Sequence, residues 1–188
     1  MYSEGWSVFI PIDYSKRRFL LRQLPLALGV AALPAVTRAG NDGRVLDLHN
    51  LHTQERLECW YYTDGEYQPQ ALERISRLFR DHRTHEQHQI DTNLLDTLFY
   101  LRNFFDAQGP IEILSGFRSA STNAMLRRRS SGVARNSYHL VGRAVDCRFP
   151  EVPMISLRDA AILSARGGVG YYPKSRFVHL DTGPVRHW

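Results

Sequence analysis

The chain has 188 residues, of which 43% are hydrophobic and 23% are charged. This length and balance suit one folded domain with a sizeable core, and they exclude a chain that is disordered throughout. The formal net charge is +5, but five basic and two acidic residues fall within the first 39, which leaves only +2 for the rest. Nucleic-acid binding requires a concentrated basic face, so we expect no nucleic-acid partner.

Residues 1–39 predict an export signal. A basic start at Lys16–Arg18 is followed by an apolar run and by small residues that end at Ala39, as in a secretory signal. The stretch "SKRRFLL" resembles a twin-arginine signal, a receptor-read address in bacteria. We therefore expect a periplasmic protein whose mature domain, residues 40–188, is not stably inserted in a membrane. An uncleaved N-terminal anchor is the alternative.

The mature part alternates short strands with amphipathic helices. Residues 43–62 predict two strands joined by a polar turn. Apolar spacing predicts helices over 69–83, 91–109 (with Asp91 as N-cap), 119–130 and 156–168. Further strands are expected at 110–117, 143–149, 169–172 and 176–183. Because neighbouring elements are close in sequence and strands cluster late, we predict a single α+β domain with a mainly antiparallel sheet and flanking helices.

Two of these strands carry metal-ligand residue types on one face. In "RAVDCRF" and "RFVHLDTG", side chains alternate, so Asp146 and His179 each lie opposite an apolar face. If the strands are neighbours, His139 can join them by way of a turn at Gly142. Two imidazoles and one carboxylate, with a fourth position left to water, are typical of a catalytic zinc site. A rival cluster, His82, His85 and His88, is interpreted as a solvated helix end.

Three stretches, "SGFRSASTN", "SYHLVGRAVD" and "GGVGYYPKSRFVHLDTGPVRHW", closely resemble the murein endopeptidase K-like family of zinc peptidases. That family is related to D-Ala-D-Ala carboxypeptidases and to the Hedgehog signalling domain, and the likeness covers about 45–188. The resemblance implies that residues 40–188 share the fold of these related domains. It also implies that His139, Asp146 and His179 bind Zn²⁺. It also implies a peptidoglycan substrate, cut at peptide crosslinks that include those between two diaminopimelate residues.

Catalytic roles beyond the metal remain open at this level. Arg118 is the candidate donor to the oxyanion; it could instead clamp a substrate carboxylate or pair structurally with an Asp. Many related peptidases carry a Glu three residues before the last His or a His two before it, but here these positions are Arg176 and Phe177. Asp181 is then a candidate base or a group that orients His179, and His187 is another candidate base.

Two other functions compete with the endopeptidase hypothesis. One is a carboxypeptidase that trims stem peptides. A deep, closed pocket around Arg118 would favour it, whereas an open groove across the metal would favour the endopeptidase. The other is a zinc-stabilised cell-wall binding module without turnover. We expect a monomer, and we expect Cys59 and Cys147 to be buried free thiols rather than a disulfide.

Overall fold

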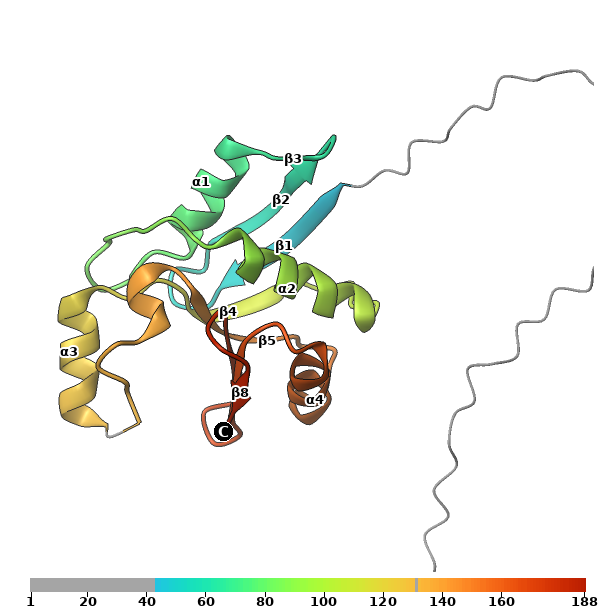
Figure 1. Cartoon of the computed structure of the whole chain (residues 1–188). Helices are drawn as coiled ribbons and strands as arrows, with labels where there is room; N and C mark the ends of the chain where they lie inside the picture. Colours follow the sequence, from blue (N-terminus) through green and yellow to red (C-terminus); the bar gives the residue numbers. More distant parts are fainter. Residues whose placement is uncertain (1–42, 131) are drawn as a thin grey trace, which may run out of the picture. The chain divides into compact units, whose positions relative to one another are not determined.

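An eight-stranded sheet organises the part of the chain that the computed structural model describes, residues 43–130 and 132–188 (Figure 1). Its strand order is β3-β2-β1-β4-β5-β7-β6-β8. The strands are β1 Arg44–Asn50, β2 Arg56–Thr63, β3 Glu66–Tyr67, β4 Ile111–Ser115, β5 Ala144–Arg148, β6 Gly168–Tyr172, β7 Phe177–Asp181 and β8 Arg186–His187. Only β1 with β4 and β6 with β8 pair in parallel among the described strands, so the predicted α+β fold with a mainly antiparallel sheet is confirmed.

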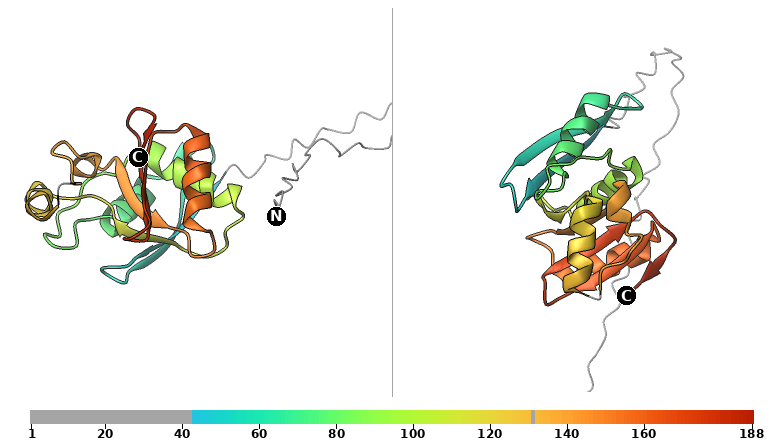
Figure 2. Two further views of the ribbon diagram at one scale, coloured as in Figure 1. Left: turned by 90° about the horizontal axis from the view of Figure 1, so that it is seen from below. Right: turned by 90° about the vertical axis from the view of Figure 1, so that its left-hand side faces the viewer.

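The described residues form α1 Pro69–Leu78, α2 Thr92–Phe104, α3 Ala120–Arg129, α4 Met154–Ser164 and a short 3₁₀ helix, η1 Tyr138–Val141. Asp91 caps α2 as predicted, since its side chain accepts from the Asn93 amide at 3.0 Å. Figures 1 and 2 show α3 beside the segment that carries η1 and well apart from α4.

None of the helices in 43–130 and 132–188 combines the length and the apolar character that a membrane span needs. The predicted export signal, residues 1–39, lies outside the described residues.

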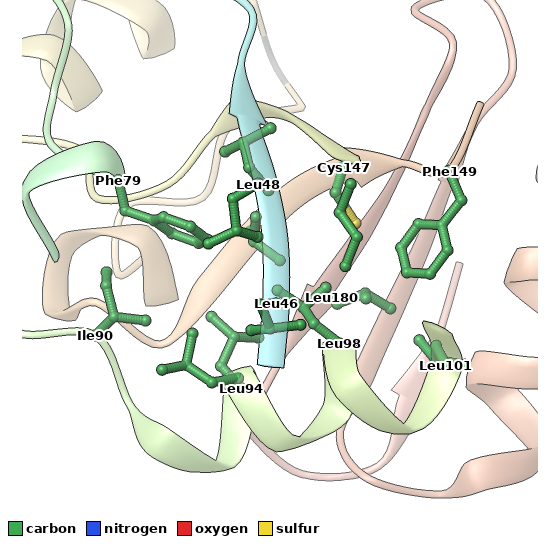
Figure 3. Packing of buried hydrophobic residues seen from close by; sticks show 14 of the residues in the cluster. Leu46, Leu48, Phe79, Ile90, Leu94, Leu98, Leu101, Cys147, Phe149 and Leu180 are labelled. Atoms are coloured by element: carbon green, nitrogen blue, oxygen red, sulfur yellow. The ribbon is translucent and has the colours of Figure 1, made fainter. Parts of the chain in front are cut away.

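The core fills one face of the sheet. Leu46 and Leu48 of β1 point toward α2, where Leu94 and Leu98 lie nearest to them and Leu101 lies farther along the helix, toward Phe149 (Figure 3). All five side chains are completely buried. Full burial of one such side chain stabilises the fold by about 1.5–3 kcal/mol. Truncating Leu98 to Ala would therefore cost about 2–5 kcal/mol, with the cavity included.

Side chains alternate along each strand, which places polar residues on the opposite face of the sheet. In β5 and β7, Val145, Cys147, Val178 and Leu180 belong to the core cluster. The residues between them point the other way, because successive side chains of a strand alternate between faces. Burial of the apolar side chains on one face thus fixes the register in which the strands pair. A slip of one strand by one residue would bury its polar side chains instead.

Three differences from the predicted elements have local causes. Helix α1 ends at Leu78 rather than at residue 83, because the following segment turns toward the loop after β4, where the Phe79 carbonyl accepts from the Phe117 amide at 2.7 Å. His82, His85 and His88 therefore lie in an irregular segment and not at a helix end. The edge strands β3 and β8 and the 3₁₀ turn η1 were not predicted, since two to four residues are too few to show a period.

Candidate metal centre

Three side chains from three elements converge on the polar face of the sheet. Asp146 of β5 lies directly opposite His179 of β7 in the antiparallel ladder, and His139 comes from η1. His179 Nδ1 is 2.8 Å from Asp146 Oδ1, and His139 Nε2 is 3.3 Å from both of these atoms. Each residue is at most 9% exposed. Among residues 43–130 and 132–188, no other group of three His, Cys, Asp or Glu is arranged to hold a metal ion.

The tautomers of both histidines are set by partners outside the cluster. Nδ1 of His139 donates to the Gly116 carbonyl at 2.7 Å, and Nε2 of His179 donates to Asp181 Oδ2 at 3.0 Å. In the neutral form of each ring, the inner nitrogen therefore carries a lone pair that points into the cluster. Metal-binding histidines are oriented by such partners in the same way.

A glycine turn brings His139 to the other two residues. Gly142 ends η1 with φ 66°, in the left-handed region. A Cβ at this position would lie 2.2 Å from the Gln89 carbonyl oxygen, so both the conformation and the space require glycine. The expected turn at Gly142 is thereby explained: it reverses the chain between His139 and the strand of Asp146.

Asp181 is placed to orient His179 and not to exchange protons with solvent. Its carboxylate is fully buried, and besides His179 it accepts from Arg186 at 2.7 Å and from the Gly183 amide at 2.8 Å. Burial alone would raise the pKa of Asp181, but the hydrogen bonds from His179 and Arg186 hold it below the usual range. Of the two roles considered for Asp181, this environment favours orientation of His179 over that of a general base.

His187 is not brought to the cluster. Arg186 reaches Asp181 and the Trp188 ring lies 5.4 Å from that of His179, so alternation along β8 directs the exposed His187 side chain away from the metal face. The candidate base His187 therefore does not contact the three clustered residues.

Arg118 does lie at the cluster. Its Nη2 is 3.5 Å from Asp146 Oδ2 and 3.3 Å from Ser115 Oγ, and its Nη1 is 3.4 Å from Asn123 Oδ1. Burial lowers the pKa of the guanidinium, which nevertheless stays cationic because an arginine pKa begins so high. A buried cation with one loose, long ion pair retains donors for a further anionic partner.

The charge balance of the three clustered residues favours an added cation. Burial raises the pKa of Asp146, but the adjacent His139 and His179 outweigh it and bring that pKa well below its usual range. Burial likewise lowers the pKa of His179, whereas hydrogen bonds to Asp146 and Asp181 raise it to about 9. Two carboxylates thus surround the His179 ring, and positive charge, from a proton or a metal ion, is stabilised there.

The cluster forms the floor of a cleft of about 480 Å³. One wall is the segment 132–138 after α3, and the other is built by Tyr172, Phe177 and Trp188. Trp188 is 51% exposed, so this second wall presents aromatic surface to whatever enters. The cleft joins three potential metal ligands, a buried cation and an apolar wall, which together suit a peptide substrate.

The residues that build the second wall were not predicted from the sequence. Gly168 and Gly170 face the cleft from β6; a Cβ on Gly168 would lie 2.4 Å from Arg186 Nη1, and one on Gly170 would lie 2.8 Å from the Trp188 ring. The two glycines thus admit Arg186 and Trp188 to the metal face. The pattern "GVGYY", with glycine at every second position of a strand, was the available signal.

Comparisons with known proteins agree with this geometry. The sequence model of the family described as "Peptidoglycan L,D-endopeptidase MepK" matches residues 38–188. The chain is 41% identical over 177 residues to the peptidoglycan L,D-endopeptidase MepK of Escherichia coli K12, covering 93% of this chain and 97% of that protein. It is also 41% identical over 181 residues to the probable peptidoglycan L,D-endopeptidase MepK of Haemophilus influenzae, covering 94% and 97%. The chain therefore belongs to the MepK family of peptidoglycan endopeptidases.

Proposed function

We propose that the protein is a zinc-dependent murein endopeptidase that hydrolyses peptide crosslinks of peptidoglycan, including links between two diaminopimelate residues. The observation that carries the proposal is the cluster of His139, Asp146 and His179 at the floor of a cleft. The names of the relatives in Escherichia coli and Haemophilus influenzae support the substrate class.

The donor set fits zinc. Two imidazole nitrogens and one carboxylate oxygen are the ligand types of catalytic zinc sites, in which the fourth position is left to water. Both inner nitrogens are oriented by the outer hydrogen bonds to Gly116 and Asp181. Zinc bound by these three residues would supply a Lewis acid and acidify a coordinated water.

The surrounding residues have separate parts in the proposed reaction. Arg118 donates to the oxygen of the scissile carbonyl as negative charge develops there, since its guanidinium lies beside Asp146 and its side chain is only 11% exposed. Asp181 fixes the orientation of His179 through Nε2 and is a positioning residue. The aromatic wall of Tyr172 and Trp188 excludes water from one side of the bound peptide.

The proposal includes export. Residues 1–39 act as a twin-arginine-like signal and residues 40–188 as the peptidase domain, which places the enzyme in the periplasm beside its substrate. A periplasmic fraction that contains the protein with its N-terminus at or near residue 40, found by mass spectrometry, would support this division. A full-length product with residues 1–39 retained in the membrane fraction would contradict it.

The decisive experiment incubates the purified, zinc-loaded domain with isolated sacculi, digests the glycan strands with a muramidase and identifies all products by mass spectrometry. An endopeptidase converts crosslinked muropeptides into uncrosslinked ones, whereas a carboxypeptidase releases only a terminal amino acid. Release of the amino acid alone would replace the proposed activity by the carboxypeptidase alternative. An unchanged set of muropeptides after incubation with fully metallated protein would favour the non-catalytic binding module.

Variants connect the activity to the cluster. His179→Ala should abolish both turnover and stoichiometric zinc, measured by elemental analysis. His85→Asn is the matched control: His85 is an exposed histidine with φ 62°, a conformation that asparagine tolerates, and it should keep both properties. Full zinc occupancy in His179→Ala would contradict this ligand assignment.

A further inference from the structure

Tyr172 is held in one orientation on the cleft wall. It follows Gly168 and Gly170 on the metal-facing side of β6, and its ring stacks on Phe177 with centroids 4.6 Å apart. Its hydroxyl oxygen accepts a hydrogen bond from Trp188 Nε1 at 2.8 Å. Because an indole nitrogen can only donate, the proton of the Tyr172 hydroxyl is not used in this bond.

Trp188 in turn is held in place by its backbone hydrogen bonds and by the space beside Gly170. Its amide donates to Val169 and its carbonyl accepts from Tyr171, at 3.1 and 3.0 Å, so β8 is anchored along β6. The indole fills the space that Gly170 leaves and contacts the ring of His179. The Tyr172–Trp188 pair is therefore a preorganised unit beside one of the proposed metal ligands.

The Tyr172 hydroxyl and Arg118 face the same space from different walls. Both line the cleft above Asp146 and His179. Arg118 Nη2 lies 3.5 Å from Asp146 Oδ2, and the Tyr172 hydroxyl is held by Trp188, whose ring lies 5.4 Å from that of His179. A carbonyl group over the cluster would lie between them.

We propose that Tyr172 is a catalytic residue that donates its hydroxyl proton in a hydrogen bond to the substrate carbonyl or to the oxyanion derived from it. Trp188 is a positioning residue that holds the Tyr172 oxygen by its indole N–H and so leaves the hydroxyl hydrogen to the substrate. Tyr172 and Arg118 then form a two-donor site for the developing negative charge. This role rests on the proposed endopeptidase function.

The test compares Tyr172→Phe with the unaltered enzyme on a purified crosslinked muropeptide. The variant keeps the ring and its stacking on Phe177 but lacks the donor. Turnover should fall by about a hundredfold, the scale for one oxyanion donor, with KM nearly unchanged. Zinc content should be unaltered, and so should the dissociation constant of the uncleaved muropeptide on metal-depleted protein, followed by tryptophan fluorescence.

Trp188→Phe tests the positioning role and should lower kcat by about tenfold, because one neutral hydrogen bond is lost. If Trp188 acts through the tyrosine, the double variant should be no slower than Tyr172→Phe alone. Tyr172→Phe with the kcat of the active parent would overturn the inference and leave the proposed function intact. A raised KM with unchanged kcat would also overturn it, since the hydroxyl would then serve binding only. A parent enzyme that cleaves no muropeptide would overturn the proposed function and this role together.

Discussion

Asp181 and His179, two residues apart on β7, are joined by a hydrogen bond of 3.0 Å from the histidine Nε2 to the carboxylate. The other ring nitrogen of His179 lies 2.8 Å from Asp146. The imidazole thus bridges two carboxylates, one buried and tied to Arg186 and the other at the candidate metal position. Rotation of the ring would break both contacts, so the pair fixes which nitrogen is offered to a metal.

Asp181→Asn should weaken zinc binding by about 10–100-fold, because the neutral amide is a poorer acceptor and no longer secures the His179 tautomer. Competition against a chromogenic chelator measures this affinity. Asp159→Asn, a change of the same chemistry at a side chain that is 54% exposed on α4, is the control and should leave it unaltered. Equal affinity in Asp181→Asn and Asp159→Asn would refute the orienting role.

Arg118→Ala should lower kcat by about a hundredfold while zinc remains bound, if the guanidinium stabilises the oxyanion. Arg118→Lys should recover only part of the rate, because lysine keeps the charge but lacks the planar fork of donors. Steady-state kinetics on a crosslinked muropeptide and elemental analysis measure the two properties. A raised KM with kcat preserved would instead assign Arg118 to a substrate carboxylate.

Gly170→Ala should reduce activity without unfolding the domain. The added methyl would lie 2.8 Å from the Trp188 ring, so the indole must move away from His179 and from the Tyr172 hydroxyl. We expect a shift of tryptophan emission together with a fall in kcat. The control is Asp159→Asn, on an exposed side chain of α4, which should change neither property. An active Gly170→Ala enzyme with unchanged emission would show that the indole position does not depend on this glycine.

Asp96 predicts an acid-sensitive step in stability. It accepts from Tyr61 and Tyr67 at 2.8 Å and pairs with Arg44 at 2.6 Å. Burial would raise its pKa, but these partners lower it below the ordinary value of 3.8. Since the folded pKa is the lower one, the ionised carboxylate stabilises the fold above about pH 4, and this contribution is lost as the pH falls through the folded pKa.

Asp96→Asn should therefore reduce the free energy of unfolding at pH 7 by about 2 kcal/mol, the scale of hydrogen bonds to a charged group. The difference from the parent should shrink as the pH is lowered from about 4 through the folded-state pKa of Asp96. Urea unfolding at several pH values measures it. A difference that is constant across this range would show that ionisation of Asp96 is not the cause.

The two cysteines should be free thiols in the folded protein. Cys59 in β2 and Cys147 in β5 are both buried and unpaired, as expected from the sequence. Strands β1 and β4 separate them, so three strand spacings of about 4.8 Å put them well beyond the roughly 7 Å that a disulfide allows. Two labels should react after unfolding without reductant, as measured by mass. Labelling that requires reductant would contradict the strand order.

Much of the fold could be predicted from the sequence because the strands and helices carry strong periods. The alternation in β5 and β7 placed Cys147 and Val178 on the core face and their neighbours Asp146 and His179 on the other. Asp91 was recognisable as an N-cap because a short polar side chain precedes an apolar helical stripe. These signals are local, so each can be recognised within a single segment of the chain.

Which residues lie next to each residue of the metal face could be learned only from the tertiary structure. The sequence made His139, Asp146 and His179 candidates, but only the pairing of β5 with β7 puts Asp146 opposite His179. Asp181 could be a base by spacing alone; only the tertiary structure shows its burial against Arg186, on which the proposed orienting role rests. The contact of Trp188 with Tyr172 also escaped prediction, because it spans 16 residues and depends on the parallel pairing of β8 with β6. Local periodicity fixes which face a side chain occupies, whereas strand order and burial decide what it meets there.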